Sequence, residues 1–202
     1  MGKFKVGFYI GRFQPVHKGH IHAITYALGK VEELIIGIGS AQFSHEIENP
    51  FTAGERFSML KLGLDENGVD RKAYWIIPIP DTRVHSLWVA QVVSYSPRFD
   101  VAFTNDPLSS ELLREAGFVV EGIPYLNREI YNATNVRERI LNGESWETLV
   151  PQSVADFIKK IRGVERIRDL AKTDNPHKPK KLKNKDYLHT CLLYTSPSPR
   201  DL

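Results

Sequence analysis

The stretch FKVGFYIGRFQPVHKGHIHAITYAL, residues 4–28, decides the fold. Its first part, residues 4–10, is short, apolar and rich in β-forming residues, and Gly11 interrupts it, which is typical of a buried strand. Within residues 20–28 the apolar side chains recur at helical spacing, so a helix is predicted there. A buried strand followed closely by an amphipathic helix is typical of an α/β protein.

Strands and helices alternate along the rest of the chain. Helix 52–66 has the clearest start, because Thr52 and Glu55 have the spacing of a capping box. The alternation predicts a Rossmann-like, doubly wound parallel sheet with helices on both faces and the C-terminal helices packed on it. In such sheets, ligands bind beyond the carboxyl ends of the strands. The remaining segments are predicted as strands at 33–38, 74–79, 100–103 and 118–121, and as helices at 86–93, 109–116, 134–141 and 151–170.

The distribution of charge and hydropathy argues against nucleic-acid and membrane partners. The 202 residues carry a formal net charge of +3, but residues 172–190 hold six Lys against two Asp, so the basic charge lies near the C-terminus. Residues 1–171 are close to neutral, and we expect no nucleic-acid-binding surface. No apolar run reaches the roughly 18 residues that span a membrane, and no signal peptide precedes the first strand. We therefore expect a cytoplasmic protein that does not bind a membrane.

Composition divides the chain into three parts. Residues 1–171 are long enough to form one domain with its own core. Residues 172–190 are rich in Lys, Pro, Asn and Asp, which predicts a basic disordered tail or linker. Residues 191–202, CLLYTSPSPRDL, look like the translation of a sequencing adapter, and we expect them to be an artefact. A natural disordered tail is the alternative, and the loss of a natural C-terminal domain stays open.

Two histidines, His17 and His20, stand three residues apart where the first helix is predicted to begin. An imidazole can donate a directed hydrogen bond to a phosphate in either protonation state, and free amides at a helix start attract anions. Gly19 lets a phosphate approach the backbone. The pattern favours phosphate binding. A metal site is one alternative, although it lacks a third ligand nearby, and a structural role is the other.

A second phosphate-binding motif is predicted at residues 132–137. Thr134 offers a hydroxyl and free amides at a helix start, and Arg137 lies one turn later on the same side. A guanidinium beside a triphosphate neutralises its charge in a fixed fork. The alternative is an ordinary helix cap with a solvated arginine.

The pattern Gly-Arg-Phe-Gln-Pro-x-His-x-Gly-His at residues 11–20 resembles the first signature of the nucleotidylyltransferases. A longer agreement is with the archaeal type of nicotinamide-mononucleotide adenylyltransferase, and it implies that residues 1–171 form a nucleotidylyltransferase domain. Several separated motifs in the same order make this resemblance more specific than the histidine pair alone. The further matching motifs lie at residues 39–42, 49–56, 77–81, 87–89, 134–137 and 163–167.

The resemblance implies a site for each of two substrates. Mg²⁺ is expected to arrive with ATP and to have no protein side chain as a ligand, and a homo-oligomer, by resemblance a hexamer, is expected. The residues expected to be catalytic are Arg12, His17, His20 and Arg137. The residues expected to bind ATP are Gly11, Arg12, Phe13, His17, Gly19, His20, Asn105, Thr134, Val136 and Arg137. The residues expected to bind nicotinamide mononucleotide are Ser40, Asp81 and Trp88.

Trp88 is assigned to the nicotinamide ring, since a cationic pyridinium stacks well on an indole. A place in the hydrophobic core is the alternative for this side chain. The sequence also departs from the family pattern. Glu48 stands where some relatives have Arg, His85 where many have Asn, and Asn132 and Ala133 where Ser and Gly are more common.

The function that the resemblance implies is transfer of AMP from ATP to nicotinamide mononucleotide, which forms NAD and pyrophosphate by direct in-line attack. Other acceptors are an alternative: nicotinate mononucleotide, FMN or phosphopantetheine. A class I tRNA synthetase fragment would need a Lys-Met-Ser-Lys-Ser-like loop, which the sequence lacks. A module that senses nucleotides without catalysis is an alternative of a different class.

Overall fold

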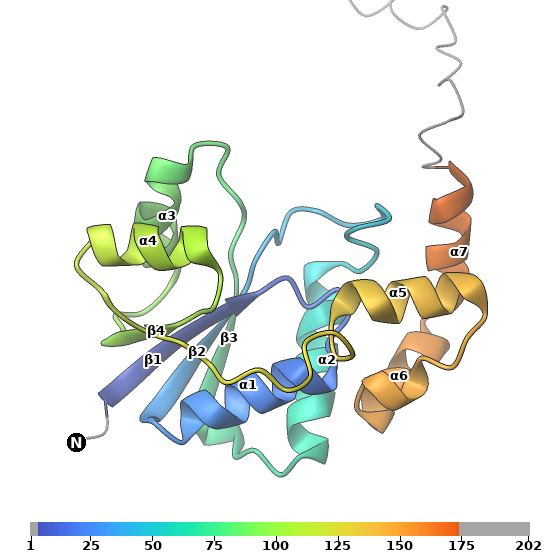
Figure 1. Ribbon diagram of the computed structural model, residues 1–202, viewed down its shortest axis with the longest axis horizontal. Helices are drawn as coiled ribbons and strands as arrows, with labels where there is room; N and C mark the ends of the chain where they lie inside the picture. Colours follow the sequence, from blue (N-terminus) through green and yellow to red (C-terminus); the bar gives the residue numbers. More distant parts are fainter. Residues whose placement is uncertain (1–3, 174–202) are drawn as a thin grey trace, which may run out of the picture.

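The computed structural model describes residues 4–173 of the chain. Five strands form one parallel sheet in the order β3-β2-β1-β4-β5, which confirms the predicted doubly wound architecture (Figure 1). The strand order reverses between β1 and β4, so the switch point of the sheet lies there. The strands are β1 (Phe4–Gly11), β2 (Val31–Ile38), β3 (Tyr74–Pro78), β4 (Val101–Phe103) and β5 (Val119–Glu121).

Helices lie on both sides of the sheet, α1 and α2 on one side and α3 and α4 on the other (Figure 1). The C-terminal helices extend the first side, because α6 packs against α2 and α7 packs against α5. The helices are α1 (Lys18–Leu28), α2 (Ala53–Glu66), α3 (Trp88–Tyr95), α4 (Pro107–Glu115), α5 (Ala133–Asn142), α6 (Gln152–Lys160) and α7 (Gly163–Thr173). Short 3₁₀ turns are η1 (Arg71–Ala73), η2 (His85–Leu87) and η3 (Glu147–Leu149).

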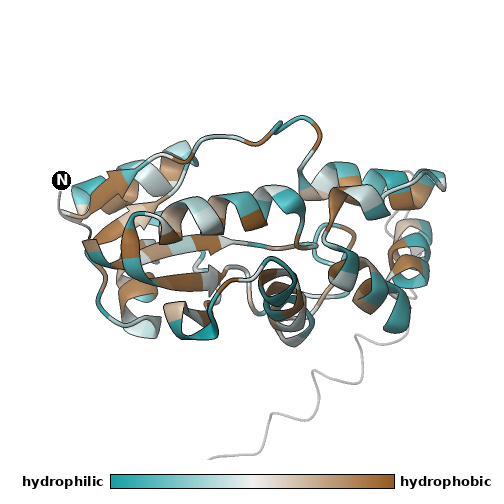
Figure 2. Ribbon diagram, turned by 90° about the horizontal axis from the view of Figure 1, so that it is seen from below, coloured by the Kyte–Doolittle hydropathy of each residue, from teal (hydrophilic) through white to brown (hydrophobic). Residues whose placement is uncertain are grey.

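Each face of the sheet builds its own hydrophobic core, because successive side chains of a strand point to opposite faces. Leu34 and Ile36 of β2 belong to the core shared with α1, α2, α5, α6 and α7, whereas Ile35 belongs to the core under α3 and α4. The strands are mainly hydrophobic and the helices are hydrophobic on part of their surface (Figure 2). Helices therefore pack on both faces of the sheet, and this packing positions the loops that follow the strands.

Helices α3 and α4 each begin two residues away from their predicted starts, at 88 instead of 86 and at 107 instead of 109. Two further differences have an identifiable cause. Helix α1 begins at Lys18, two residues before the predicted start, because His17 caps it. The predicted single helix 151–170 is broken between α6 and α7, where Arg162 has a φ of 56°. Gly163 lies so close to Phe51 that an added Cβ would be 2.8 Å from its ring. The close approach of Phe51 to the backbone at the start of α7 therefore accompanies the break.

Within residues 4–173, no helix is long and apolar enough to cross a membrane. Helix α7 extends to Thr173, two residues past the predicted end of the domain. The rest of the predicted tail, up to residue 190, and the predicted artefact at 191–202 lie outside the described residues. The division of the chain into three parts therefore stays a prediction.

Candidate active site

His17 and His20 cap helix α1 together. The backbone N–H of His20 donates to Nδ1 of His17, and the backbone N–H of His17 donates to Nδ1 of His20, each over 3.3 Å. This is a capping box in which two imidazoles replace the usual hydroxyl and carboxylate. The two rings stack with their centres 3.6 Å apart. The ring of Phe13 packs against that of His20, with a centre distance of 4.7 Å.

The reciprocal cap fixes the tautomer of both histidines. Because each Nδ1 accepts a backbone N–H, the proton of each neutral ring is on Nε2. Burial lowers the pKa of His17 to about 3. Burial, followed by the nearby His17, lowers the pKa of His20 well below its ordinary value. In the absence of a ligand, the pair therefore presents two neutral Nε2–H donors rather than two cations.

The lowered pKa values predict that the folded state loses stability in acid. The unfolded chain takes up a proton at each histidine below about pH 6.5, whereas folded His17 stays neutral down to about pH 3. The expected loss is up to about 1.4 kcal/mol per pH unit for each histidine as the pH falls through this window. Urea unfolding at pH 7.5 and pH 5 measures it. A His20→Gln variant, which can keep the cap without titrating, should lose less, and an equal loss would contradict the assignment.

The loop between β1 and α1 is tied to the rest of the site by three sets of hydrogen bonds. The amide of Gln14 pairs with the backbone of Phe51, donating over 2.9 Å and accepting over 3.0 Å. Arg137 donates to the Gln14 carbonyl over 2.8 Å. Arg56, which is fully buried, donates to the carbonyl of Arg12 over 2.9 Å. The loop between β1 and α1 is therefore anchored from α2, α5 and the segment before α2.

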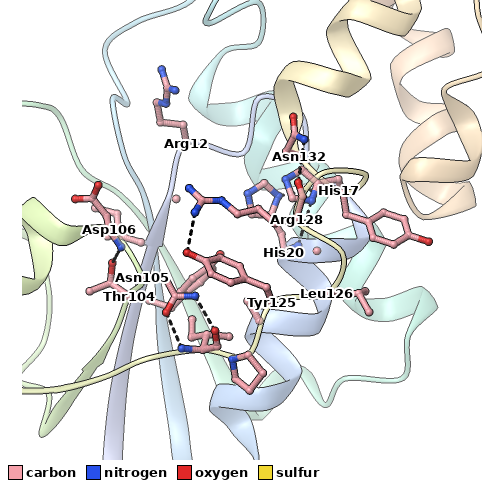
Figure 3. Close-up of a pocket in the computed structure, with 18 of the residues that line it drawn as sticks. Arg12, His17, His20, Thr104, Asn105, Asp106, Tyr125, Leu126, Arg128 and Asn132 are labelled. Carbon is pink, nitrogen blue, oxygen red and sulfur yellow. Dashed lines mark hydrogen bonds between the residues drawn. The ribbon is translucent and has the colours of Figure 1, made fainter.

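A cavity of about 620 Å³ opens at the switch point between β1 and β4, beyond the carboxyl ends of the strands. This volume is in the range of pockets that bind small molecules and cofactors. The cavity lies where the fold class predicts a ligand site. Of the residues predicted to bind ATP, those that line the cavity are Gly11, Arg12, His17, Gly19, His20 and Asn105 (Figure 3).

Gly19 and Asn105 line the cavity but have structural tasks as well. A Cβ on Gly19 would be 2.9 Å from the carbonyl oxygen of Tyr131, so the absence of a side chain lets the loop after β5 approach α1. The amide of Asn105 donates to the carbonyl of Ile123 over 2.6 Å and accepts from its N–H over 2.8 Å. Asn105 therefore joins the loops after β4 and β5.

The second predicted phosphate motif lies at the start of α5. Arg137 donates to Thr134 Oγ1 over 3.4 Å, in addition to its bond to the Gln14 carbonyl. Burial and then the positive charge of Arg12 lower the pKa of Arg137, while Glu48 opposes the shift. The hydrogen bond from Arg137 to Gln14 ties α5 to the loop that carries Arg12 and His17. Both motifs therefore converge on the same loop.

The structure does not bring all predicted ATP residues to the cavity. The side chain of Phe13 is 1% exposed, and that of Val136 is fully buried in the core. The N–H of Val136 is bound to the carbonyl of Asn132. Phe13 and Val136 therefore support the site from beneath, while Thr134 and Arg137 lie next to the phosphate loop but outside the cavity lining.

Two of the residues predicted to bind nicotinamide mononucleotide, Ser40 and Asp81, are hydrogen-bonded to each other. The hydroxyl of Ser40 donates to Asp81 over 2.6 Å, and its N–H donates to the same carboxylate over 3.2 Å. The structure therefore places Ser40 and Asp81 together beyond β2 and β3. Trp88 is half-buried at the start of α3 and packs against the core beneath α3 and α4.

Several known proteins are similar to this chain over most of its length. Residues 8–139 match the model of the cytidylyltransferase-like family. The nicotinamide-nucleotide adenylyltransferase of Pyrococcus furiosus is 52% identical over 168 residues, which are 83% of this chain and 89% of that protein. The chain belongs to the nicotinamide-nucleotide adenylyltransferases. The family member from Archaeoglobus fulgidus is also 52% identical, over 83% of this chain and 98% of that protein.

Solved structures of adenylyltransferases have the same fold. A bifunctional NMN adenylyltransferase/ADP ribose pyrophosphatase from Francisella tularensis superposes with a TM-score of 0.73 and 25% identity, over 85% of this chain. This chain spans about half of that protein, 54% of its length. A second structure of such a protein from the same organism, complexed with AMP and a manganese ion, gives a TM-score of 0.69 at 24% identity.

The sequence did not reveal the part that the loop after β5 plays in this adenylyltransferase. That loop has no hydrophobic period, so of its lining residues only Asn132 belongs to a motif predicted from the sequence. One feature of the sequence could have indicated this loop: it follows the carboxyl end of a predicted strand, as the other predicted site motifs do. The lining residues that it contributes are Ile123, Pro124, Tyr125, Leu126, Arg128, Tyr131 and Asn132.

Proposed function

We propose that this adenylyltransferase transfers AMP from ATP to nicotinamide mononucleotide, releasing pyrophosphate and forming NAD. The observation that carries the proposal is the pair of Nε2–H donors on His17 and His20 at the switch-point cavity. The membership of the chain in the nicotinamide-nucleotide adenylyltransferases supports the choice of acceptor.

The reaction needs alignment and charge stabilisation rather than a general base. An oxygen of the 5′-phosphate of nicotinamide mononucleotide, which is already ionised, attacks the α-phosphorus of ATP. The bond from the α-phosphorus to the oxygen that bridges the α- and β-phosphates breaks, and pyrophosphate takes the electron pair. His17 and His20 donate hydrogen bonds to the α- and β-phosphates as negative charge moves onto the leaving group. Arg12 and Arg137, with Thr134, bind the departing pyrophosphate.

A divalent cation, Mg²⁺, belongs to the proposal as a partner of ATP. In residues 4–173 no group of three or more His, Cys, Asp or Glu side chains is placed to hold a metal ion. The phosphate oxygens of ATP are hard ligands of the kind that Mg²⁺ prefers. When bound, the cation neutralises part of the phosphate charge. The reaction rate should therefore fall when a chelator removes divalent cations and return when Mg²⁺ is added.

The decisive experiment compares acceptors side by side. Purified protein, ATP and Mg²⁺ are incubated with nicotinamide mononucleotide, nicotinate mononucleotide, FMN or phosphopantetheine, and the pyrophosphate and the dinucleotide product are measured. NAD formation with nicotinamide mononucleotide supports the proposal. A clear preference for FMN or phosphopantetheine would replace the acceptor, and ATP binding without pyrophosphate release would favour a nucleotide sensor.

Replacing Trp88 tests the proposed nicotinamide platform. A Trp88→Ala variant should raise the KM for nicotinamide mononucleotide by about tenfold, because one aromatic stacking and cation–π contact is lost. The KM for ATP should change less than twofold. Trp88→Phe keeps an aromatic face and should lie between the two. Equal increases in both KM values, together with a lower melting temperature, would assign Trp88 to the core instead.

A further inference from the structure

We propose that Arg128 is a further ATP-binding residue, a cation that the loop after β5 extends to the phosphate chain of ATP. This inference rests on the proposed function for the identity of the nucleotide. It adds a third arginine, from a third part of the fold, to Arg12 after β1 and Arg137 on α5.

Arg128 lies where it can reach a ligand in the cavity. It lines the switch-point cavity together with both histidines, and its side chain is exposed. Figure 3 shows the side chain crossing the cavity from the loop toward the side where Arg12 lies. The guanidinium can therefore reach a ligand that contacts the histidine donors.

The charge of Arg128 is not neutralised by the protein. Its side-chain partner in residues 4–173 is Tyr125, whose hydroxyl accepts a hydrogen bond over 3.0 Å and whose ring centre is 4.8 Å from the guanidinium carbon. No carboxylate in residues 4–173 forms an ion pair with Arg128. The carboxylate of Asp106, which also lines the cavity, accepts instead from the N–H and hydroxyl of Ser109, over 2.8 and 2.7 Å.

A phosphate is a stronger partner for this guanidinium than the phenol is. Hydrogen bonds between a cation and a phosphate oxygen are about twice as strong as neutral ones, and the planar fork of arginine can make two in parallel. Four of the five N–H donors of Arg128 have no recorded acceptor in the described part of the chain. Tyr125 therefore holds the side chain over the cavity without satisfying its charge.

The backbone that carries Arg128 is fixed, so only its side chain needs to move. The amide of Asn132 donates to the carbonyls of Arg128 and Glu129, over 3.0 and 3.2 Å. The carbonyl of Tyr131 lies against Gly19 of α1. Since Asn132 is also the N-cap of α5, the loop is held at the starts of both phosphate-binding helices. A cation on this loop completes a phosphate site whose other groups come from α1 and α5.

The test compares the binding of ATP and of adenosine to an Arg128→Met variant by isothermal titration calorimetry. Methionine keeps most of the aliphatic stem and removes the charge. Affinity for ATP should fall by about 10- to 100-fold, the scale of one lost charge-assisted hydrogen bond. Affinity for adenosine, which has no phosphate, should change less than twofold. Arg114→Met, on the exposed surface of α4 and outside the cavity, is the matched control and should bind both ligands as the wild type does.

Two results would overturn the inference. Unchanged ATP affinity would remove Arg128 from the site, and an equal loss for ATP and adenosine would make its role structural. Tyr125→Phe, which keeps the ring and removes the hydroxyl, should weaken ATP binding only about two- to fivefold, because the charged guanidinium remains. Because binding is measured without turnover, a wild type that binds ATP through Arg128 but forms no NAD would refute the proposed function and leave this inference standing.

Discussion

A His20→Ala variant should keep its fold and lose most of its catalytic rate. The substitution removes one of the two Nε2–H donors proposed to stabilise charge on the α- and β-phosphates. The loss should be about 2–4 kcal/mol of barrier, the range for one oxyanion donor, or on the order of 30- to 1,000-fold in kcat. Steady-state kinetics with saturating ATP and nicotinamide mononucleotide measure this effect.

The matched control separates catalysis from helix capping. His20→Ala also removes the acceptor for the His17 N–H, whereas His20→Gln places the usual capping-box residue at the same position. At pH 7.5, His20→Gln should therefore unfold like the wild type and still be slower than it in catalysis, since the amide cannot reproduce the position of the Nε2 donor. If His20→Ala had nearly wild-type kcat, His20 would have no part in the mechanism.

An Arg56→Met variant should be strongly destabilised, although Arg56 is not itself among the residues predicted to bind a substrate. Its guanidinium is fully buried and donates to backbone carbonyls of four loop residues and of Thr52. Leaving these buried acceptors without partners should lower the free energy of unfolding by about 3–5 kcal/mol. Urea unfolding measures the loss. The four loop acceptors are the carbonyls of Arg12, Gly39, Ser40 and Phe43.

Arg56→Lys is the control for charge at this position. Burial lowers the pKa of Arg56 to about 10, so the guanidinium is still protonated at pH 7. A lysine keeps the charge but has a single nitrogen, which cannot reach all of these carbonyls. It should recover only part of the lost stability. A stability of Arg56→Met within about 1 kcal/mol of the wild type would mean that the loops satisfy their carbonyls in another way.

Much of the fold could be predicted from local patterns. The strand preceding Gly11 and the capping box of Thr52 and Glu55 are found as predicted, because each depends on neighbours in the sequence. The break between α6 and α7 could not be predicted in this way. Apolar residues continue through Ile161 at helical spacing, and the cause of the close packing at Gly163 is Phe51, more than 100 residues away.

The candidate site was predictable where chemistry and local spacing coincide. His17 and His20 are three residues apart, and the structure joins them directly. Which other residues face the cavity depends on their burial in the folded chain, and the spacing of residues in the sequence does not reveal that burial. Phe13 lies beneath His20 instead of facing the cavity. Arg128 lies on an irregular loop, so no period marks it, and only the folded chain places it opposite the phosphate loop.

The reciprocal histidine cap also determines which ions this site rejects. A transition metal needs a free lone pair on a ring nitrogen. In this pair both Nδ1 lone pairs accept backbone N–H groups, and both Nε2 atoms carry protons. To bind zinc through Nε2, a ring would have to lose the proton on Nε2 or move it to Nδ1. A proton on Nδ1 would point at the backbone N–H that this nitrogen accepts, and the cap of α1 would be lost. Binding of zinc by these rings would therefore cost the α1 cap, whereas donation of Nε2–H to a phosphate oxygen would leave the cap in place.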